Sequence, residues 1–397
     1  MEDKLIYFDN AATSFPKPEL VYRENDAVLR TTGNPGRGGH RLSLNSARTI
    51  FDARTALANF LGLPESRAER LIFTPGCTQS INIVLRSINF QRNDVVLVSA
   101  LEHNAVMRPL HRLQKNIGIK IQGLPYAAHN IIDPAQLKDC LQSVRPRLCV
   151  FMEASNVSGE KLQLETIAEI CQAAGVELLI DAAQTAGTKC DTLKSDGITY
   201  WAAPGHKHML GSPGVGLLYC NSDTVLEPLV CGGTGSASEQ LDMPVHLPDR
   251  LEAGTLPVPA IASLMAGVRF VQEVGADHRN KHESHLAQSL REWCRSRDWI
   301  TVAGNTFNGR KYSEEDACAA VVSFSMKDLS ADRIADALDS DYGIAVRAGL
   351  HCAARAHETL GTSAQGLVRV SFGFFNTLDE LSQLYTALEE LHNRISR

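Results

Sequence analysis

The feature that most constrains the fold is a regular alternation of short apolar runs with helical patterns over residues 70–181. The runs RLIFTPG, DVVLVSA, RLCVFMEA and VELLID each have the composition of a buried strand. Strands that alternate with helices build a mostly parallel sheet flanked by helices on both faces, so the sequence predicts an α/β fold. Each run ends in polar residues, and ligands bind such sheets at the carboxyl ends of the strands. The turns after these four strands are therefore the expected location of a functional site.

A proline-rich interruption divides the chain into two regions. At 397 residues the chain exceeds the usual size of one hydrophobic core, which favours two domains. The stretch RLEAGTLPVPAI breaks the pattern, and a long helical segment follows from about Ile261. We expect a large domain over residues 16–258 and a smaller α+β domain over residues 259–397, which includes the N-terminal residues 1–15.

The last segment, NTLDELSQLYTALEELHNR, predicts a C-terminal helix. Thr377 and Glu380 have the spacing of a capping box, in which each side chain satisfies a backbone N–H of the first turn. The apolar face of this helix is formed by Leu381, Leu384, Leu388 and Leu391.

Composition excludes several classes of partner. The formal net charge is -6 and no run of Lys and Arg could follow a phosphate backbone, so we expect no nucleic acid. The polar, acidic start MEDKLIYFDN does not resemble a secretory signal, and no uncharged stretch reaches about 18 residues. We expect no membrane partner and a cytoplasmic location.

Cysteine and histidine patterns do not favour a metal site. The ten cysteines include no CxxC pair, which argues against a zinc ribbon and a disulfide framework. The segment DHRNKHESH places His278, His282 and His285 at helical spacing, but the charged residues Arg279, Lys281 and Glu283 lie among them. We interpret this segment as a solvated helix face, because metal-binding histidines need an ordered second shell. We therefore expect no metal.

A lysine between two histidines, in GHKHMLGSPGVG, carries the strongest functional signal. A lone loop lysine is usually a solvated charge, but an apolar strand upstream delivers Asp181 at its end and Gln184 three residues later. A pyridine cofactor needs an acid to keep its ring nitrogen protonated and a lysine to hold its aldehyde. The combination of Asp181, Gln184 and Lys207 therefore predicts a pyridoxal-phosphate site.

Eight motifs together resemble the cysteine desulfurases and selenocysteine lyases of the class V aminotransferase superfamily. In chain order they are YFDNAATS, EHNA, SNVSG, IDAAQTAG, GHKHMLGSPGVG, EAGT, RAGLHC and VRVSFGFFNT. The resemblance extends from Tyr7 to Thr377 and implies an aminotransferase fold of type I. The short loop around Cys352 is similar to that of the second group of these enzymes.

The resemblance implies roles for the residues of these motifs. Lys207 would hold the aldehyde of pyridoxal 5'-phosphate and move the substrate α-proton, with His103 lying over the ring. Asp181 would pair with the ring nitrogen, and Arg369 would bind the substrate carboxylate. The remaining contacts that it implies are Gln184 and Asn156 at the phenolic oxygen or the substrate, Cys77, Thr78 and His206 at the phosphate, Thr255 from the second subunit of a homodimer, Ala12 and Asn376 in the walls, and His40 near a neighbouring site.

The implied reaction is the removal of sulfur from L-cysteine, which leaves alanine and a persulfide on Cys352 for an acceptor protein. Arg347 and His351 flank this cysteine and would favour its thiolate. Selenocysteine lyase, cysteine sulfinate desulfinase, a class V aminotransferase or β-lyase, and a non-catalytic sulfur carrier are alternatives. The chain departs from the family pattern at Pro204, Cys77 and Leu350, which leaves the phosphate contacts and the preferred substrate open.

Overall fold

The computed structural model describes residues 5–36, 38–126, 131–194, 196–222, 224–304 and 317–395. Its largest sheet has seven strands in the order β2-β8-β7-β6-β5-β3-β4. Among the described strands of this sheet, only β8 runs antiparallel to its neighbours, so the predicted mostly parallel α/β fold is confirmed. The strands are β2 (Leu71–Thr74), β3 (Val95–Val98), β4 (Lys120–Gly123), β5 (Leu148–Met152), β6 (Glu177–Asp181), β7 (Tyr200–Pro204) and β8 (Gly216–Cys220).

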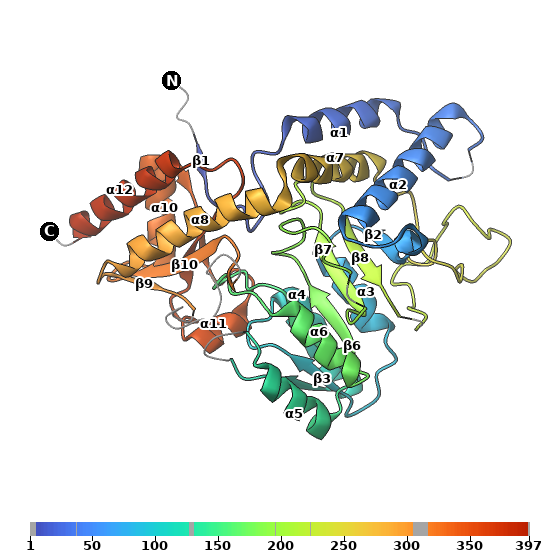
Figure 1. The fold of residues 1–397 in the computed structure, drawn as a ribbon, viewed down its shortest axis with the longest axis horizontal. Helices are drawn as coiled ribbons and strands as arrows, with labels where there is room; N and C mark the ends of the chain where they lie inside the picture. Colours follow the sequence, from blue (N-terminus) through green and yellow to red (C-terminus); the bar gives the residue numbers. More distant parts are fainter. Residues whose placement is uncertain are drawn as a thin grey trace.

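Helices cover both faces of this sheet (Figure 1). Because side chains alternate along a strand, neighbouring residues such as Leu179 and Ile180 enter different cores. Behind the sheet in Figure 1, one core contains apolar side chains of α3 (Cys77–Ser87) and α4 (Asn104–Ile117). The core on the opposite face contains apolar side chains of α2 (Arg41–Phe60), α5 (Pro134–Val144), α6 (Leu164–Ala173) and α7 (Val258–Val274). Two further helical elements are α1 (Glu19–Thr31), which packs on α7, and η1 (Glu65–Arg70).

A second, antiparallel sheet has its own core. Its strand order is β12-β13-β10-β9, and the N-terminal residues Ile6 and Phe8 belong to its core. The boundary at residue 258, where α7 begins, stays a prediction. The elements of this part are β9 (Ile300–Val302), β10 (Val321–Met326), β12 (Arg347–Gly349), β13 (Leu367–Ser371), α8 (Ala276–Arg295), α10 (Ala331–Tyr342), α11 (Ala354–Leu360), α12 (Leu378–Ile395) and the parallel pair β1 (Ile6–Tyr7) and β11 (Ile344–Ala345).

The C-terminal helix begins as the sequence predicts. The Glu380 backbone N–H donates to Thr377 Oγ1 (3.2 Å), and the Thr377 N–H donates to Glu380 Oε2 (3.1 Å). These bonds form a capping box and satisfy two backbone donors of the first turn. The four predicted leucines of α12 are all buried in the second core.

The interpretation of α8 as a solvated face is wrong for two of its residues. Arg279 and Glu283 are only 0% and 2% exposed, and they form an ion pair (Nε to Oε1, 3.2 Å). The Arg279 guanidinium also donates to the carbonyls of His208 (2.6 Å) and Gly187 (2.7 Å). A buried charge needs such partners to offset its desolvation. The pair therefore ties α8 to the two loops that follow β6 and β7.

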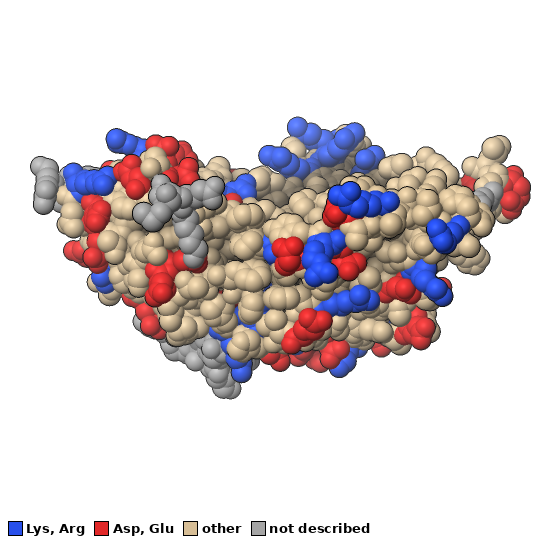
Figure 2. All heavy atoms as spheres, turned by 90° about the horizontal axis from the view of Figure 1, so that it is seen from above, with Lys and Arg blue, Asp and Glu red and all other residues tan. Residues whose placement is uncertain are grey.

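Lys, Arg, Asp and Glu side chains are interspersed over much of the face seen in Figure 2. No helix in the described part of the chain is both long enough and apolar enough to span a membrane.

Candidate active site

The carboxyl ends of the strands form one cavity of about 680 Å³. Asp181 is the last residue of β6, and Lys207 lies in the turn after β7. Cys77 begins α3 after β2, and His103 caps α4 after β3. The structure thus brings together six of the residues predicted for the site, namely Cys77, Thr78, His103, Asp181, His206 and Lys207.

The carboxylate of Asp181 is buried and partly hydrogen-bonded. Its Oδ1 accepts from the Ala183 backbone N–H (3.0 Å) and from Cys77 Sγ (3.4 Å). Burial, and then the negative charge of Asp181, raise the pKa of Cys77 well above its usual value. Cys77 is therefore a neutral thiol whose hydrogen is directed to Asp181.

The amine of Lys207 is easily deprotonated. Burial lowers its pKa to about 8, and the positive charge of Arg369 adds to this effect, whereas Asp181 opposes it. The neighbouring His206 has its pKa lowered to about 4 by burial and by the charges of Lys207 and Lys17. His206 is therefore neutral near pH 7, and its Nδ1 lies 3.1 Å from Thr13 Oγ1.

His103 has a defined tautomer when it is neutral. Its Nδ1 accepts a hydrogen bond from the Ala105 backbone N–H (3.0 Å), as an N-cap of α4. Burial lowers the pKa of His103, which favours the neutral ring. Because Nδ1 is an acceptor, the single ring proton resides on Nε2, which leaves this nitrogen as a hydrogen-bond donor.

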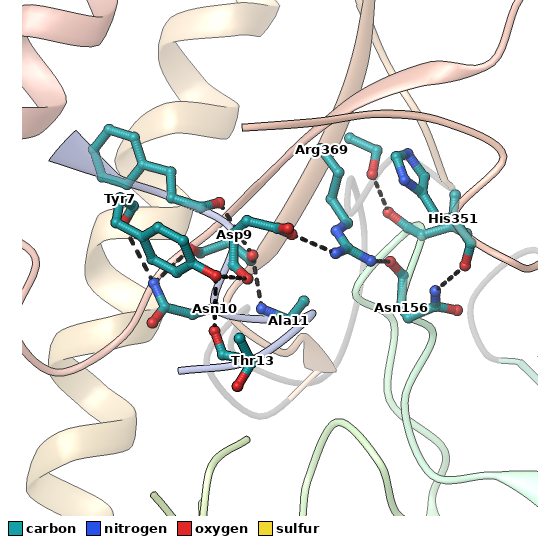
Figure 3. Close-up of polar contacts among 12 residues, drawn as sticks. Tyr7, Asp9, Asn10, Ala11, Thr13, Asn156, His351 and Arg369 are labelled. Carbon is teal, nitrogen blue, oxygen red and sulfur yellow. Dashed lines mark hydrogen bonds and ion pairs between the residues drawn. The ribbon is translucent and has the colours of Figure 1, made fainter. Parts of the chain in front are cut away.

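Arg369 lies in β13, and Figure 3 shows its contacts with Asp9 and Asn156. It is 2% exposed, and its guanidinium pairs with Asp9 Oδ1 (2.6 Å) and donates to the Asn156 carbonyl (3.3 Å). Its Nε has no hydrogen-bond partner among the described residues. Arg347 is opposite Arg369 in the β12–β13 register, so the two side chains lie on the same face of the sheet. The sequence analysis linked Arg347 only to Cys352, because nothing in the sequence fixes this register across α11.

Two buried amides present unpaired oxygens. Asn156 and Gln184 are 6% and 3% exposed, and neither Asn156 Oδ1 nor Gln184 Oε1 has a partner among the described residues. Their amide nitrogens donate to the carbonyls of His351 (2.8 Å) and Ala11 (3.1 Å). Ala12, the next predicted residue, lies in the same N-terminal turn, where its N–H donates to the Asp9 carbonyl (3.0 Å). Buried acceptors are usually paired, so these two oxygens are available to accept hydrogen bonds from a bound molecule.

Cys352 is exposed in the turn that follows β12. The Cys352 carbonyl accepts from the Asn104 backbone N–H (2.8 Å), and Asn156 holds the carbonyl of His351. Both His351 and Cys352 have left-handed backbones, with φ of 49° and 56°. The turn is therefore fixed by its backbone, while the thiol stays accessible.

The predicted electrostatic role of His351 is wrong. Its side chain is buried, while that of the next residue, Cys352, is exposed. Burial, and then the positive charge of Arg369, lower the pKa of His351 to about 2. The ring is therefore neutral near pH 7 and provides no positive charge for a thiolate.

Thr255 and His40 lie outside the cavity of Lys207. Both are exposed, and Thr255 lines a second hollow of about 600 Å³ with Gly235 and Asp249. His40 is the N-cap of α2, where its Nδ1 accepts from the Ser43 N–H (3.3 Å). Within one chain these two residues therefore do not contribute to the site.

Lys17 is a site residue that the sequence analysis missed. Its ammonium donates to Ser14 Oγ (2.8 Å), to the Ser14 carbonyl (3.1 Å) and to the His206 carbonyl (3.0 Å). Lys17 thus joins the N-terminal turn to the residue just before Lys207. A sequence signal was available, because Lys17 lies three residues after the end of the DNAATS motif, but its partner is 189 residues away.

Comparisons with known proteins agree with this geometry. A family model described as Aminotransferase class-V matches residues 6–384. A probable cysteine desulfurase of Methanothermobacter thermautotrophicus is 30% identical over 397 residues, covering 97% of this chain and 94% of that protein. Another from Pyrococcus abyssi is 29% identical, covering 98% and 95%. The apo structure of a cysteine desulfurase from Thermococcus onnurineus NA1 superposes with a TM-score of 0.87 at 28% identity, covering 98% and 94% of the two chains. The cysteine desulfurase CsdA (S-sulfonic acid) from Escherichia coli gives 0.84 at 26% identity, covering 98% and 95%.

Proposed function

Because the chain belongs to the cysteine desulfurase branch of the class V aminotransferase family, we propose that it removes sulfur from L-cysteine with pyridoxal 5'-phosphate. Enzymes of this family generally use that cofactor. In the proposed reaction the products are L-alanine and a persulfide on Cys352. Selenocysteine and cysteine sulfinate remain alternative substrates.

The cavity fits the cofactor in charge and in hydrogen bonding. Lys207 offers an amine of lowered pKa for the aldehyde, and Asp181 offers a buried carboxylate for the ring nitrogen. The N-terminus of α3 opens into the cavity at Thr78, where free backbone N–H groups favour an anion. The unpaired oxygens of Asn156 and Gln184 match polar groups of the ring or the substrate. When bound, the cofactor supplies an electron sink at the substrate α-carbon.

The residues around the cavity then bind the substrate and move its α-proton. Arg369 keeps an unpaired Nε–H, and Arg347 lies beside it in register, so the pair can bind a carboxylate. Lys207, as a neutral amine, takes the α-proton, because its pKa is near the working pH. His103 donates a hydrogen bond through Nε2.

Cys352 receives the sulfur. Its Sγ forms a bond to the substrate sulfur, the Cβ–S bond breaks, and its electron pair stays with the three-carbon fragment. That fragment takes up one proton at Cβ, regains the α-proton from Lys207, and leaves as alanine. The exposed position of Cys352 allows a second protein to accept the sulfur. We also propose a homodimer in which Thr255 and His40 reach the partner's cavity, because both are exposed and outside their own.

The observation that carries this proposal is an exposed cysteine whose turn is held through its backbone by Asn156 and by Asn104, which lies between the cavity-lining residues His103 and Ala105. Cys352→Ala tests it, with Cys231→Ala as a control because Cys231 is also an exposed cysteine. We expect Cys352→Ala to lose alanine formation from cysteine by about a hundredfold or more, since no nucleophile accepts the sulfur. Cofactor absorbance should be retained in both variants. Alanine formation at the parent rate, with no persulfide on the parent enzyme, would indicate a β-lyase or an aminotransferase.

A further inference from the structure

One face of the described chain is basic, although the protein as a whole is acidic. Residues 75–123 contain six Lys or Arg and two Asp or Glu, whereas the full chain has 39 and 45. One of these two acids, Glu102, is fully buried, and burial raises its pKa to about 8, so it is largely uncharged near pH 7. Figure 2 shows a group of basic side chains at its upper edge with no acidic side chain among them, on the rear side where α3 and α4 lie in Figure 1.

The basic side chains of α4 form a stripe in line with the residue that contacts Cys352. Arg108, Arg112 and Lys115 are exposed and follow Asn104 at intervals of four, four and three residues. Such spacing places all four residues on one helix face. None of the three cations makes an ion pair or hydrogen bond with the described residues. Their charges are therefore available to a partner.

The stripe is close enough to Cys352 to share one interface with it. The Asn104 N–H donates to the Cys352 carbonyl (2.8 Å), and Arg108 and Lys115 follow at roughly 6 and 16 Å along the helix axis. A typical protein interface buries about 800 Å² on each side, which covers such a distance. Leu350, two residues before Cys352, is 41% exposed and adds an apolar contact next to the thiol.

We propose that the stripe Arg108–Arg112–Lys115 is the docking surface for an acceptor protein whose reactive thiol lies within an acidic surface. This proposal rests on the proposed function, because it names the kind of protein that takes the sulfur from Cys352. The acidic surface pairs with the stripe, while Leu350 and Cys352 contact the region around the thiol. In the transfer, the acceptor thiolate bonds to the outer persulfide sulfur, the S–S bond to Cys352 breaks, and Cys352 leaves as a thiolate. No external oxidant or reductant is needed.

The test uses two short peptides with a central cysteine, one flanked by glutamates and one by lysines. The holoenzyme, loaded with persulfide from cysteine, is mixed with each peptide, and mass spectrometry follows the transfer. We expect the glutamate peptide to react about tenfold faster at low salt, and this advantage to disappear at about 0.5 M salt. In Arg108→Glu/Arg112→Glu the preference should reverse. The control variant Lys327→Glu/Arg333→Glu makes the same change of charge at exposed positions in the region of the four-stranded sheet. It should leave the peptide preference unchanged.

Three further measurements separate the outcomes. Alanine formation with dithiothreitol as acceptor should be the same in all three proteins, and its absence in the parent would overturn the proposed function. Binding of peptides with serine in place of cysteine needs no chemistry, so equal binding of both peptides to the parent would overturn the docking surface alone. A single-stranded oligonucleotide is the third probe. If the variant Arg108→Glu/Arg112→Glu no longer bound the oligonucleotide but kept the preference for the glutamate peptide, α4 would be a nucleic-acid surface and the proposal would be wrong.

Discussion

The cavity around Lys207 and the turn around Cys352 hold their reactive groups in opposite ways. In the cavity, burial lowers the pKa of Lys207, and burial together with the charge of Asp181 raises the pKa of Cys77. Cys352 is exposed, and its turn is held through the backbone carbonyls of His351 and Cys352 itself. Side-chain burial controls protonation in the first region, and backbone tethering preserves access in the second. The difference indicates a division of labour, with proton transfer inside the cavity and sulfur delivery at its exposed edge.

Removing the amine from the cavity is the strongest way to test this division. In Lys207→Ala we expect turnover to fall by at least about a thousandfold, because both the covalent attachment and the general base are lost. Thermal stability should change little, since a loop amine facing a cavity contributes little packing. Alanine formation, cofactor absorbance and thermal unfolding are the measurements. Lys189→Ala is the control, because Lys189 is an exposed lysine. Ordinary turnover by Lys207→Ala would contradict its assignment.

The two regions should also differ in thiol reactivity. With iodoacetamide near pH 8, we expect Cys352 to be alkylated on the order of a hundredfold faster than Cys77. Cys77 is buried, and its pKa is raised well above the usual value, so both access and thiolate are reduced. Site-resolved mass spectrometry measures both rates in one sample. Equal rates would mean that the cavity does not protect Cys77, and the contrast between the regions would fail.

The sequence predicted the parts of this arrangement that depend on local patterns. Apolar runs that end in polar residues gave the strands and the meeting of Asp181 and Lys207 at one sheet edge. The spacing of Thr377 and Glu380 gave the start of α12. Both features need only the order of residues along a few turns or strands.

The features that sequence reasoning missed depend on contacts between distant segments. Arg279 and Glu283 have the spacing of a solvated pair, and only the loops of His208 and Gly187 make their burial possible. His351 flanks Cys352 in the sequence but turns inward, because both residues adopt a left-handed backbone. No pattern along a single segment encodes these outcomes.

A smaller effect should come from the edge of the cavity that we assign to the partner subunit. If Thr255 binds the phosphate as we propose, Thr255→Val removes one hydrogen bond, which contributes about 1.5–3 kcal/mol when the acceptor is charged. We expect cofactor affinity to fall by about ten- to a hundredfold. Cofactor release on dilution, with mass measured in solution, tests this expectation. Thr386→Val is the control, because Thr386 lies on the exposed side of α12. Unchanged affinity in Thr255→Val would remove Thr255 from the phosphate site.

The smallest effect concerns the protonation of Lys207 before the cofactor binds. Only a neutral amine attacks an aldehyde, and burial lowers the pKa of Lys207 from the usual lysine range to about 8. The neutral fraction therefore rises with pH, and we expect the rate of cofactor loading to increase about tenfold between about pH 7 and pH 9 and then level off. An exposed lysine would give a rate that still rises beyond pH 9. Stopped-flow absorbance on the apoenzyme measures the profile.

Arg369→Gln separates the two causes of this shift. The positive charge of Arg369 lowers the pKa of Lys207 after burial does, so its removal should move the loading profile to higher pH. Burial of the amine stays, so the profile should remain below that of an exposed lysine. A shift to lower pH would mean that Arg369 acts on Lys207 mainly by holding Asp9 and Asn156 in place rather than by its charge. An unchanged profile would show that the cavity screens Lys207 from Arg369, and that the cavity and the second sheet are electrostatically independent.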